Sequence, residues 1–307
     1  MSPNLDLEIS EHSQPGEDGA GTTGASAEIP DYYNDTVADY DAWSKEGYLH
    51  FGYWRPWLNP FRRRPMLEEM NRLIFTNLGL RDLRQGSVAD LGCGVGAVAR
   101  HGSRTFNNLD FHAMTLSAEQ VARGKSLHEQ ERVSYYVGDY HQLPFEDSSI
   151  DRIYYLESLC HSTTPDAALA EAARALKPGG KIALTDGYIT RPLDETSKLF
   201  QHVVRGVAHN WAVPMFHEIE LAEKWTGAGN LRLAVNRECG WHLGPSALHA
   251  IHLSAWHFVK LNAERFFSRG GVKEWQWKHL TASAYTVALG LYRKYFRYHL
   301  LVFEKPL

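Results

Sequence analysis

The run 88–96 combines a short apolar strand, a carboxylate and a glycine-rich turn. It reads Val-Ala-Asp-Leu-Gly-Cys-Gly-Val-Gly, with Asp90 near the end of the strand and Gly92, Gly94 and Gly96 in the turn. Glycines at alternate positions expose backbone N–H groups and let a ligand approach the main chain closely. In α/β sheets, nucleotide-type cofactors bind at such strand–turn–helix junctions. The spacing therefore predicts a cofactor site.

Two features distinguish between candidate cofactors. Enzymes that bind NAD place an acidic residue at the end of the next strand, where it holds the ribose hydroxyls. The next apolar run, 109–114, ends in Ala113-Met114 without a carboxylate. Asp90, in contrast, can accept a hydrogen bond from an ammonium group, which S-adenosylmethionine carries and NAD lacks. The residues favour S-adenosylmethionine over a nicotinamide oxidoreductase, although Gly92, Gly94 and Ala97 also satisfy the looser dinucleotide fingerprint.

The run 88–96 resembles motif I of the class I S-adenosylmethionine-dependent methyltransferases. The segment 113–120, Ala-Met-Thr-Leu-Ser-Ala-Glu-Gln, is similar to the Thr/Asn-Leu-Ser-x-x-Gln element of the sterol, tocopherol and cyclopropane-fatty-acid methyltransferases. This resemblance implies that Thr115 and Gln120 cover the adenosine, which that branch binds without the usual ribose carboxylate. The residue types also fit a capping box that begins at Ser117, and both interpretations can hold together.

Two further segments, 137–140 and 156–161, carry the resemblance. Val137-Gly138-Asp139-Tyr140 resembles the adenine-binding turn, which implies that Asp139 accepts a bond from the exocyclic amine and that Tyr140 lies beside the cofactor. As a bare pattern, Gly-Asp is a common turn pair.

The segment 156–161, Leu-Glu-Ser-Leu-Cys-His, resembles the Glu-x-x-x-His element of the sterol and tocopherol branch. Glu157 and His161 follow a predicted central strand, at the edge where α/β sheets place their sites. A carboxylate there can stabilise positive charge or take a proton, and a histidine acts near neutral pH as a base or relay. We expect both residues to be catalytic and Glu157 also to face the cofactor. The alternative is a buried hydrogen-bonded pair.

An aromatic N-terminal run, 32–54, resembles the segment that closes over cofactor and acceptor in these methyltransferases. The resemblance implies site roles for Tyr33 and His50, whose polar ends need partners. Hydrophobic packing of a cap is an equally good interpretation for Trp43, Trp54 and Trp57.

The aromatic cap, Glu157 and the related enzymes together predict C-methylation of an isoprenoid or prenylated compound, because aromatic faces and a carboxylate stabilise a carbocation. Apolar side chains between 200 and 216 either line the acceptor pocket or form a cap core: Phe200, Val203, Val204, Val207, Trp211, Val213 and Phe216. The run Arg62-Arg63-Arg64 either binds a diphosphate or is a solvated face. The alternative function is O-methylation of a phenol or sugar hydroxyl, with His161 or His50 as general base. A cofactor-binding protein without catalysis leaves Glu157 and His161 unexplained.

Composition narrows the setting of this chemistry. The chain has 307 residues, of which 44% are hydrophobic, and a formal net charge of −4, which gives no reason to expect a nucleic-acid partner. Cys93, Cys160 and Cys239 lack zinc or CxxC spacing, so we expect no metal and a reducing, cytoplasmic location. Apolar runs are too short to span a membrane, and the N-terminus does not have the pattern of a secretory signal. A small hydrophobic acceptor is the expected partner, and a homo-oligomer is compatible with the sequence.

Apolar runs alternate with helix-length segments along the centre of the chain. Strands are predicted at 87–91, 109–114, 133–137, 150–156, 181–186, 231–239 and 298–304. This alternation predicts an α/β fold with a Rossmann-like, doubly wound, seven-stranded and mostly parallel sheet. We expect a disordered tail over 1–28, a helical cap over 29–80, the cofactor-binding core over 81–189, a helical cap insertion over 190–230, and the remaining core strands and helices over 231–307.

Overall fold

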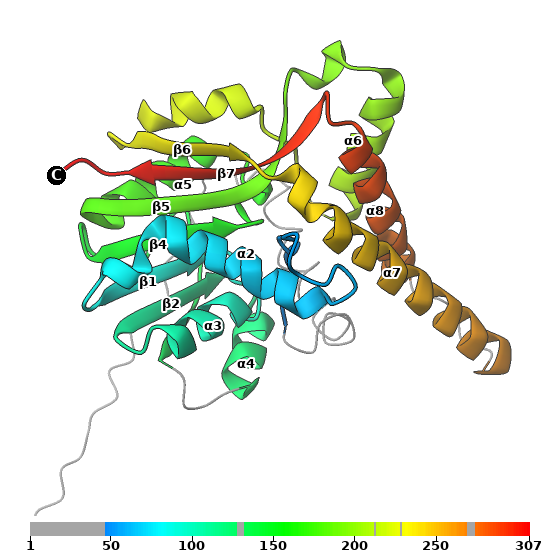
Figure 1. Ribbon diagram of the computed structural model, residues 1–307, viewed down its shortest axis with the longest axis horizontal. Helices are drawn as coiled ribbons and strands as arrows, with labels where there is room; N and C mark the ends of the chain where they lie inside the picture. The colour runs from blue at the N-terminus through cyan, green and yellow to red at the C-terminus, as the bar shows by residue number, and fades with distance from the viewer. Residues whose placement is uncertain (1–46, 128–131, 212, 228, 269–273) are drawn as a thin grey trace, which may run out of the picture.

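The computed structural model describes residues 47–127, 132–211, 213–227, 229–268 and 274–307. Its centre is a seven-stranded sheet with the order β3-β2-β1-β4-β5-β7-β6 (Figure 1). The strands are β1 (Gly86–Leu91), β2 (Leu109–Thr115), β3 (Val133–Val137), β4 (Ile150–Leu156), β5 (Leu176–Ile189), β6 (Arg232–Glu238) and β7 (Phe296–Glu304).

The sheet is parallel from β3 through β5, and β7 lies antiparallel between β5 and β6. Strand order reverses between β1 and β4, because β2 lies on one side of β1 and β4 on the other. Loops that leave the carboxyl ends of such strands diverge and open a crevice for a ligand. The predicted fold class is confirmed, and this switch point lies where the glycine-rich turn was expected.

Helices cover both faces of the sheet. The α-helices are α2 (Arg63–Leu78), α3 (Ala97–Thr105), α4 (Ala118–Leu127), α5 (Pro165–Ala175), α6 (Lys198–Asn210), α7 (Gly240–Ser268) and α8 (Glu274–Leu291). Short 3-10 helices are η1 (Leu80–Asp82), η2 (Leu159–His161), η3 (Leu193–Glu195) and η4 (Ile219–Gly227). One core packs α2 and α3 against the sheet, and a second packs α5 and η4 against the opposite face.

Helices α6, α7 and α8 form a separate layer beside the carboxyl ends of the strands. α8 packs on both α6 and α7, and Figure 1 shows α7 and α8 extending together beyond the sheet. Phe200, Val204 and Leu289 are buried in a third core between α6 and α8. No helix in the described part of the chain is both long and apolar enough to cross a membrane.

The predicted strands differ from the observed ones mainly at β5. The sequence predicts a strand over 181–186 after a turn at Pro178-Gly179-Gly180, whereas β5 runs from Leu176 to Ile189. Pairing with β7 explains the extension at the carboxyl end, because the register continues to Ile189 opposite Phe296, whereas at the other end Leu176 pairs with Ile150 of β4. The expected disordered tail at 1–28 lies outside the described residues.

Candidate active site

A cavity of about 760 Å³ opens at the carboxyl ends of the central strands. Its wall brings together the glycine-rich turn after β1, the loops after β2, β3 and β4, Asp186 and Gly187 of β5, and side chains of α6, α7 and α8. The predicted cofactor segments therefore share one cavity with the C-terminal helices, for which the sequence suggested no role.

The glycine-rich turn has the backbone conformation that its sequence predicts. Gly92, Gly94 and Gly96 all have positive φ, at 82°, 55° and 75°. A Cβ atom at Gly92 would lie 2.3 Å from the Cβ of Ser158, whose hydroxyl donates to the Leu91 carbonyl at 2.6 Å. The turn after β1 thus packs directly on the loop after β4, and only glycine fits there.

Asp90 is buried beside this turn. In the described part of the chain its Oδ2 atom has no hydrogen-bond partner, and burial raises the pKa of the carboxyl group to about 7. A buried carboxylate oxygen without a partner is unfavourable until a donor or a cation reaches it. Asp90 lines the cavity, so its surroundings fit the ammonium group of S-adenosylmethionine.

Thr115 and Gln120 meet as the sequence predicted. The Thr115 hydroxyl donates to Gln120 Oε1 at 2.6 Å, and the Gln120 N–H donates to the Ser117 hydroxyl at 3.1 Å. Both side chains are buried and line the cavity. The capping interpretation of Ser117 therefore holds together with a position on the cavity wall.

Asp139 and Tyr140 continue this wall. Asp139 Oδ1 accepts bonds from both the backbone N–H and the Nδ1 of His141, at 2.9 and 2.6 Å. The Tyr140 hydroxyl donates to the Ser158 carbonyl at 3.2 Å, which connects the loop after β3 to the loop after β4. The predicted cofactor residues therefore line one cavity, except for Gly96, which is not part of its wall.

Glu157 follows β4 in a strained conformation. Its φ is 52°, which is uncommon for a residue with a side chain and recurs at functional sites. Oε1 accepts the Phe51 N–H at 2.9 Å and the Tyr298 hydroxyl at 2.8 Å. Burial raises the pKa of Glu157 to about 8, although both donors lower it in part.

Asp186 is a second carboxyl group in this part of the cavity, and the sequence analysis did not single it out. β4 and β5 pair with Leu156 opposite Thr185, so Glu157, which follows β4, lies at the level of Asp186 in β5. Asp186 accepts the N–H groups of Cys160 and Gly187, each at 2.9 Å, and burial raises its pKa to about 6. A carboxylate at the carboxyl end of a parallel strand was the available signal, since the same signal identified Asp90.

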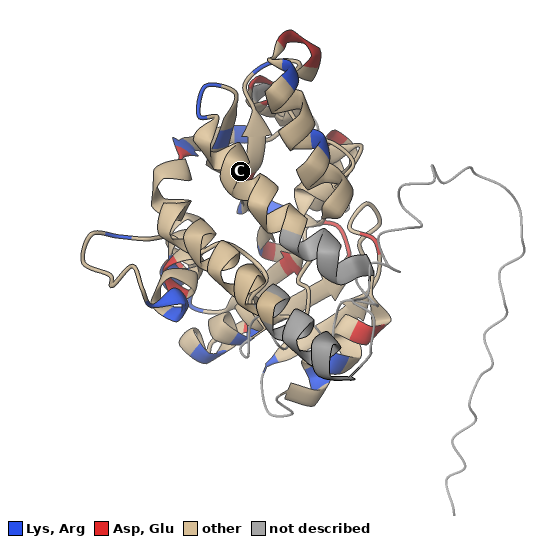
Figure 2. Cartoon of the chain, turned by 90° about the vertical axis from the view of Figure 1, so that its right-hand side faces the viewer, with Lys and Arg blue, Asp and Glu red and all other residues tan. Residues whose placement is uncertain are grey.

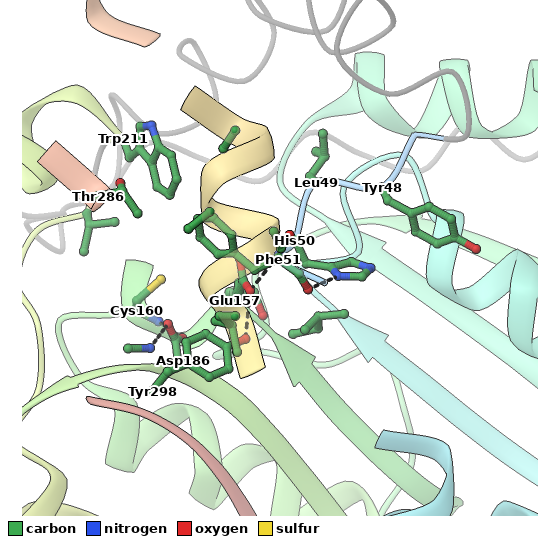
Figure 3. A pocket seen from close by; sticks show the side chains of 18 of the residues that line it. Tyr48, Leu49, His50, Phe51, Glu157, Cys160, Asp186, Trp211, Thr286 and Tyr298 are labelled. Atoms are coloured by element: carbon green, nitrogen blue, oxygen red, sulfur yellow. Dashed lines mark hydrogen bonds between the residues drawn. The ribbon is translucent and has the colours of Figure 1, made fainter. Parts of the chain in front are cut away.

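The two predicted histidines, His161 and His50, both line the cavity. His161 lies in η2 and lines the cavity. His50 is buried, its Nδ1 donates to the Phe51 carbonyl at 2.9 Å, and burial lowers its pKa to about 4. Figure 3 shows Glu157, Asp186 and Tyr298 together, with the His50 ring turned away toward Tyr48. Tyr33 lies outside the described residues.

The remaining wall is apolar and partly aromatic. Phe51 stacks on Trp211 with ring centroids 6.0 Å apart, and α7 contributes Leu243 and Leu253. Residues 240–259 of α7 contain no Asp, Glu, Lys or Arg. In Figure 2, which faces the side from which α7 and α8 project, most of the central ribbon is tan. The cavity therefore suits a hydrophobic acceptor.

The predicted acceptor residues are divided between this wall and a helix core. Val207, Trp211, Val213 and Phe216 line the cavity, whereas Phe200, Val203 and Val204 are buried against α8 and its neighbours. The cap-core interpretation thus holds for Phe200, Val203 and Val204, and an acceptor role for the cavity-lining residues stays a prediction.

The arginine run is similarly divided. Arg63 lines the cavity, whereas Arg64 forms an ion pair with Glu68 at 2.8 Å and Arg62 is exposed. A diphosphate role for the run stays a prediction.

The segment 48–54 is attached to α7, which explains how Phe51 reaches Glu157. The Gly52 N–H donates to the Ser246 hydroxyl at 2.8 Å, and the Trp54 N–H donates to the His242 carbonyl at 2.8 Å. Contacts between segments so distant in sequence have no local signal.

Comparison with known proteins agrees with this geometry. Residues 89–184 match the family described as a methyltransferase domain. The methyltransferase GfsG of Streptomyces halstedii is 32% identical over 179 residues, which are 56% of this chain and 62% of that protein. The 27-O-demethylrifamycin SV methyltransferase of Amycolatopsis mediterranei is 28% identical over 271 residues, covering 84% and 90% of the two chains.

The sterol 24-C-methyltransferase of Eremothecium gossypii is 29% identical over 139 residues. This alignment covers 44% of the chain and 37% of that enzyme. The chain therefore spans less than two thirds of the length of both GfsG and the sterol enzyme.

Solved structures share the whole fold. The cyclopropane synthase MmaA2 of Mycobacterium tuberculosis has a TM-score of 0.76 at 15% identity, with 92% and 98% of the two chains covered. The geranyl diphosphate C-methyltransferase of Streptomyces coelicolor, solved with S-adenosyl-L-homocysteine, has a TM-score of 0.67 at 16% identity, with 94% and 100% covered. The domain match and these structures support the predicted cofactor, S-adenosylmethionine. The chain contains a methyltransferase domain and has the fold of the class I S-adenosylmethionine-dependent methyltransferases.

Proposed function

We propose that this protein transfers a methyl group to a carbon atom of a small hydrophobic acceptor, an isoprenoid or prenylated natural product. The observation that carries the proposal is a pair of carboxyl groups, the half-buried Glu157 and the buried Asp186, which face a largely apolar and aromatic cavity. Neither carboxyl group forms an ion pair with a described Lys, Arg or His side chain. The pair is therefore available to a positive charge that arises in the cavity itself.

Residues along the first part of the chain hold the cofactor in this proposal. The glycine turn admits it, Asp90 accepts from its ammonium group, and Thr115, Gln120 and Asp139 surround the adenosine. When bound, S-adenosylmethionine supplies a methyl group on a positively charged sulfur. Asp90 must be ionised for its role, and the incoming ammonium group favours that form.

The apolar wall positions the acceptor and excludes water. Trp211 and Phe51 offer aromatic faces beside the carboxyl pair, and Leu243 and Leu253 complete the wall from α7. Aromatic faces attract a cation through their quadrupoles, and the low dielectric of the cavity strengthens that attraction. This environment suits an alkene whose methylation leaves a positive charge.

The carboxyl pair then removes a proton. Bound S-adenosylmethionine would supply its methyl group to an alkene carbon and would keep the electron pair of the broken sulfur–methyl bond on sulfur. The acceptor now carries the positive charge on the adjacent carbon. A carboxylate oxygen of the pair takes a proton from a neighbouring C–H, and those electrons restore a double bond. Because burial raises the pKa of both groups, the pair is a better base than an exposed carboxylate.

O-methylation is the second candidate, and His161 favours it. His161 lines the cavity at the end of η2, where a hydroxyl could lose its proton to an imidazole. The name of the rifamycin relative contains an O-methylation, which supports the same possibility for this chain. His50 suits this role less well, because its pKa of about 4 and its bond to the Phe51 carbonyl fit a neutral positioning residue.

Product analysis with wild type and two variants tests the proposal. Prenyl alkenes and phenols are each incubated with the enzyme and S-adenosylmethionine carrying a deuterated methyl group, and products are located by mass spectrometry and NMR. We expect label on carbon, with turnover lost in Glu157→Gln and Asp186→Asn and retained in His161→Ala. Label on oxygen, with loss only in His161→Ala, would establish the second candidate. A cytoplasmic location of the protein and a contribution of Tyr33 to the site stay predictions.

A further inference from the structure

Asp139, His141 and Ser162 form a chain of hydrogen bonds beside the cofactor end of the cavity. Asp139 and His141 follow β3, and Ser162 follows η2. His141 Nδ1 lies 2.6 Å from Asp139 Oδ1, and His141 Nε2 lies 2.8 Å from the Ser162 hydroxyl. Of these three residues, the sequence resemblance implies a role for Asp139 alone.

The partners determine which nitrogen of His141 carries the proton. A carboxylate only accepts, so Nδ1 donates to Asp139. The Ser162 hydroxyl already accepts the Thr164 N–H at 3.1 Å, and its own proton can therefore be donated to Nε2. A neutral imidazole thus satisfies both ends of the chain.

The order Asp-His-Ser is also that of a hydrolytic triad, but the burial of the serine excludes that use here. Ser162 is 1% exposed and is absent from the cavity wall, whereas Asp139 and His141 are part of it. A nucleophile must reach its substrate, and this hydroxyl reaches only His141 and Thr164. The chain of bonds therefore acts on Asp139.

His141 forms two hydrogen bonds to the same oxygen of the Asp139 carboxylate. Oδ1 accepts both the backbone N–H and the side chain of His141. Among the described residues, no donor lies on Oδ2. A pair of ribose hydroxyls would use both oxygens, whereas an exocyclic amine needs only one acceptor.

The anchor of His141 is itself well held. The Ser162 carbonyl accepts a bond from His217 Nε2 at 2.9 Å, and His217 is buried. His141 also packs on Tyr140, with ring centroids 4.9 Å apart. The imidazole is therefore fixed on three sides, as a group that orients another side chain must be.

We propose that His141 is a positioning residue that leaves Asp139 a single available oxygen and so makes this turn selective for a base with an exocyclic amine. The inference rests on the proposed function, because it requires the adenosine of S-adenosylmethionine to lie at this turn. The lowered pKa of Asp139, caused first by the bond from His141, keeps the carboxylate in its accepting form.

Calorimetric titration with two ligands tests this inference. S-adenosylhomocysteine carries the amine, and S-inosylhomocysteine has a carbonyl oxygen in its place, which would face Asp139 Oδ2 unfavourably. We expect the wild-type chain to bind S-adenosylhomocysteine at least about tenfold more tightly than S-inosylhomocysteine, because the second ligand loses one charge-assisted hydrogen bond. His141→Phe keeps the ring against Tyr140 and removes both bonds, so this ratio should fall at least about fivefold.

Matched variants separate positioning from general stability. His112→Phe removes another histidine that bonds a neighbour, Tyr136, away from the cavity, and should keep the wild-type ratio. Asp139→Asn combined with His141→Phe should discriminate no less than Asp139→Asn alone, because His141 acts through Asp139. Ser162→Ala keeps the imidazole, removes its anchor and should lower the ratio about twofold, which also provides the test if His141→Phe does not fold.

Three results would contradict the positioning role of His141 or the proposed function. An unchanged ratio in His141→Phe, or equal loss of both ligands, would overturn the positioning role. Additive losses in the double variant would do the same. A folded wild-type chain that binds neither ligand would instead overturn the proposed function.

Discussion

The Tyr298 hydroxyl donates a 2.8 Å hydrogen bond to Glu157 Oε1, across 141 residues of sequence. Glu157 leaves the end of β4, and Tyr298 lies near the start of β7, with β5 between the two strands. The Phe51 N–H completes the pair of donors on the same oxygen. This arrangement directs the strained Glu157 side chain into the cavity and keeps its second oxygen available to the acceptor.

Removing the carboxyl charge of Glu157 should affect turnover and leave cofactor binding intact. We expect Glu157→Gln to lower kcat by about 100-fold or more, within the range for a general base. Its affinity for S-adenosylhomocysteine should stay near the wild-type value in a calorimetric titration. Glu195→Gln, at an exposed position of η3, is the matched control. Wild-type turnover in Glu157→Gln would remove this residue from the mechanism.

Removing the Tyr298 hydroxyl should have a smaller effect of the same kind. Tyr298→Phe deletes a donor that lowers the pKa of Glu157, so the pKa of the carboxyl group should rise further. We expect kcat to fall about tenfold, because one hydrogen bond to a charged group is lost. The pH–rate profile should shift to higher pH, because Glu157 must be ionised to accept a proton. An unshifted profile would mean that the hydroxyl only packs against Glu157.

Cofactor affinity should depend on pH through Asp90. Its pKa of about 7 means that the buried carboxyl group is increasingly ionised, and able to pair with an ammonium group, as the pH rises through neutrality. We expect the affinity for S-adenosylhomocysteine to rise between pH 6 and pH 8, about tenfold at most per unit for one ionisation. Asp90→Asn should bind about 10- to 100-fold more weakly and lose this dependence. An unchanged affinity in Asp90→Asn would contradict the assignment of the glycine-turn motif.

The ligand-free protein should lose stability as the pH rises. Asp90, Glu157 and Asp186 have ordinary pKa values of 3.8, 4.5 and 3.8, and the folded chain raises them to about 7, 8 and 6. The folded state therefore binds more protons than the unfolded state, and the free energy of unfolding falls between about pH 4 and pH 8. We expect Tm to drop by about 3 °C or more from pH 5.5 to pH 8. The drop should be smaller in Glu157→Gln, and an equal drop would contradict the burial argument.

Two glycines offer a matched pair for the turn itself. In Gly92→Ala the new Cβ would meet Ser158 at 2.3 Å in a backbone with φ of 82°. We expect a loss of about 2 kcal/mol or more in stability, from strain and overpacking, and no measurable cofactor binding. Gly244→Ala in α7 meets no atom within 4 Å and should leave stability unchanged or raise it by up to about 1 kcal/mol. Thermal melting and calorimetry measure both effects.

Much of the cofactor end could be predicted because its residues are local in sequence. The glycine turn spans five residues, and Thr115 bonds Gln120, which lies only five residues further along the chain. Strand and turn patterns of this length are determined by short-range backbone preferences, so the sequence predicted both the turn and the cofactor. The same signal was present at Asp186 and was overlooked.

The acceptor end could not be derived in this way. Glu157 receives its donors from Phe51 and Tyr298, and Phe51 is oriented by bonds that its neighbour Gly52 makes to α7. The pairing of β7 between β5 and β6 brings Tyr298 into the site, and no spacing in the sequence encodes that pairing.

By itself, the sequence determined the fold class, the cofactor and the loops proposed to bind it, because those features depend on local patterns. The tertiary structure decided how Glu157 and Asp186 share a cavity, how His50 and His161 are placed in its wall, and that α7 forms part of that wall. These features depend on long-range packing, in which burial changes the pKa of each carboxyl group and distant strands supply the donors.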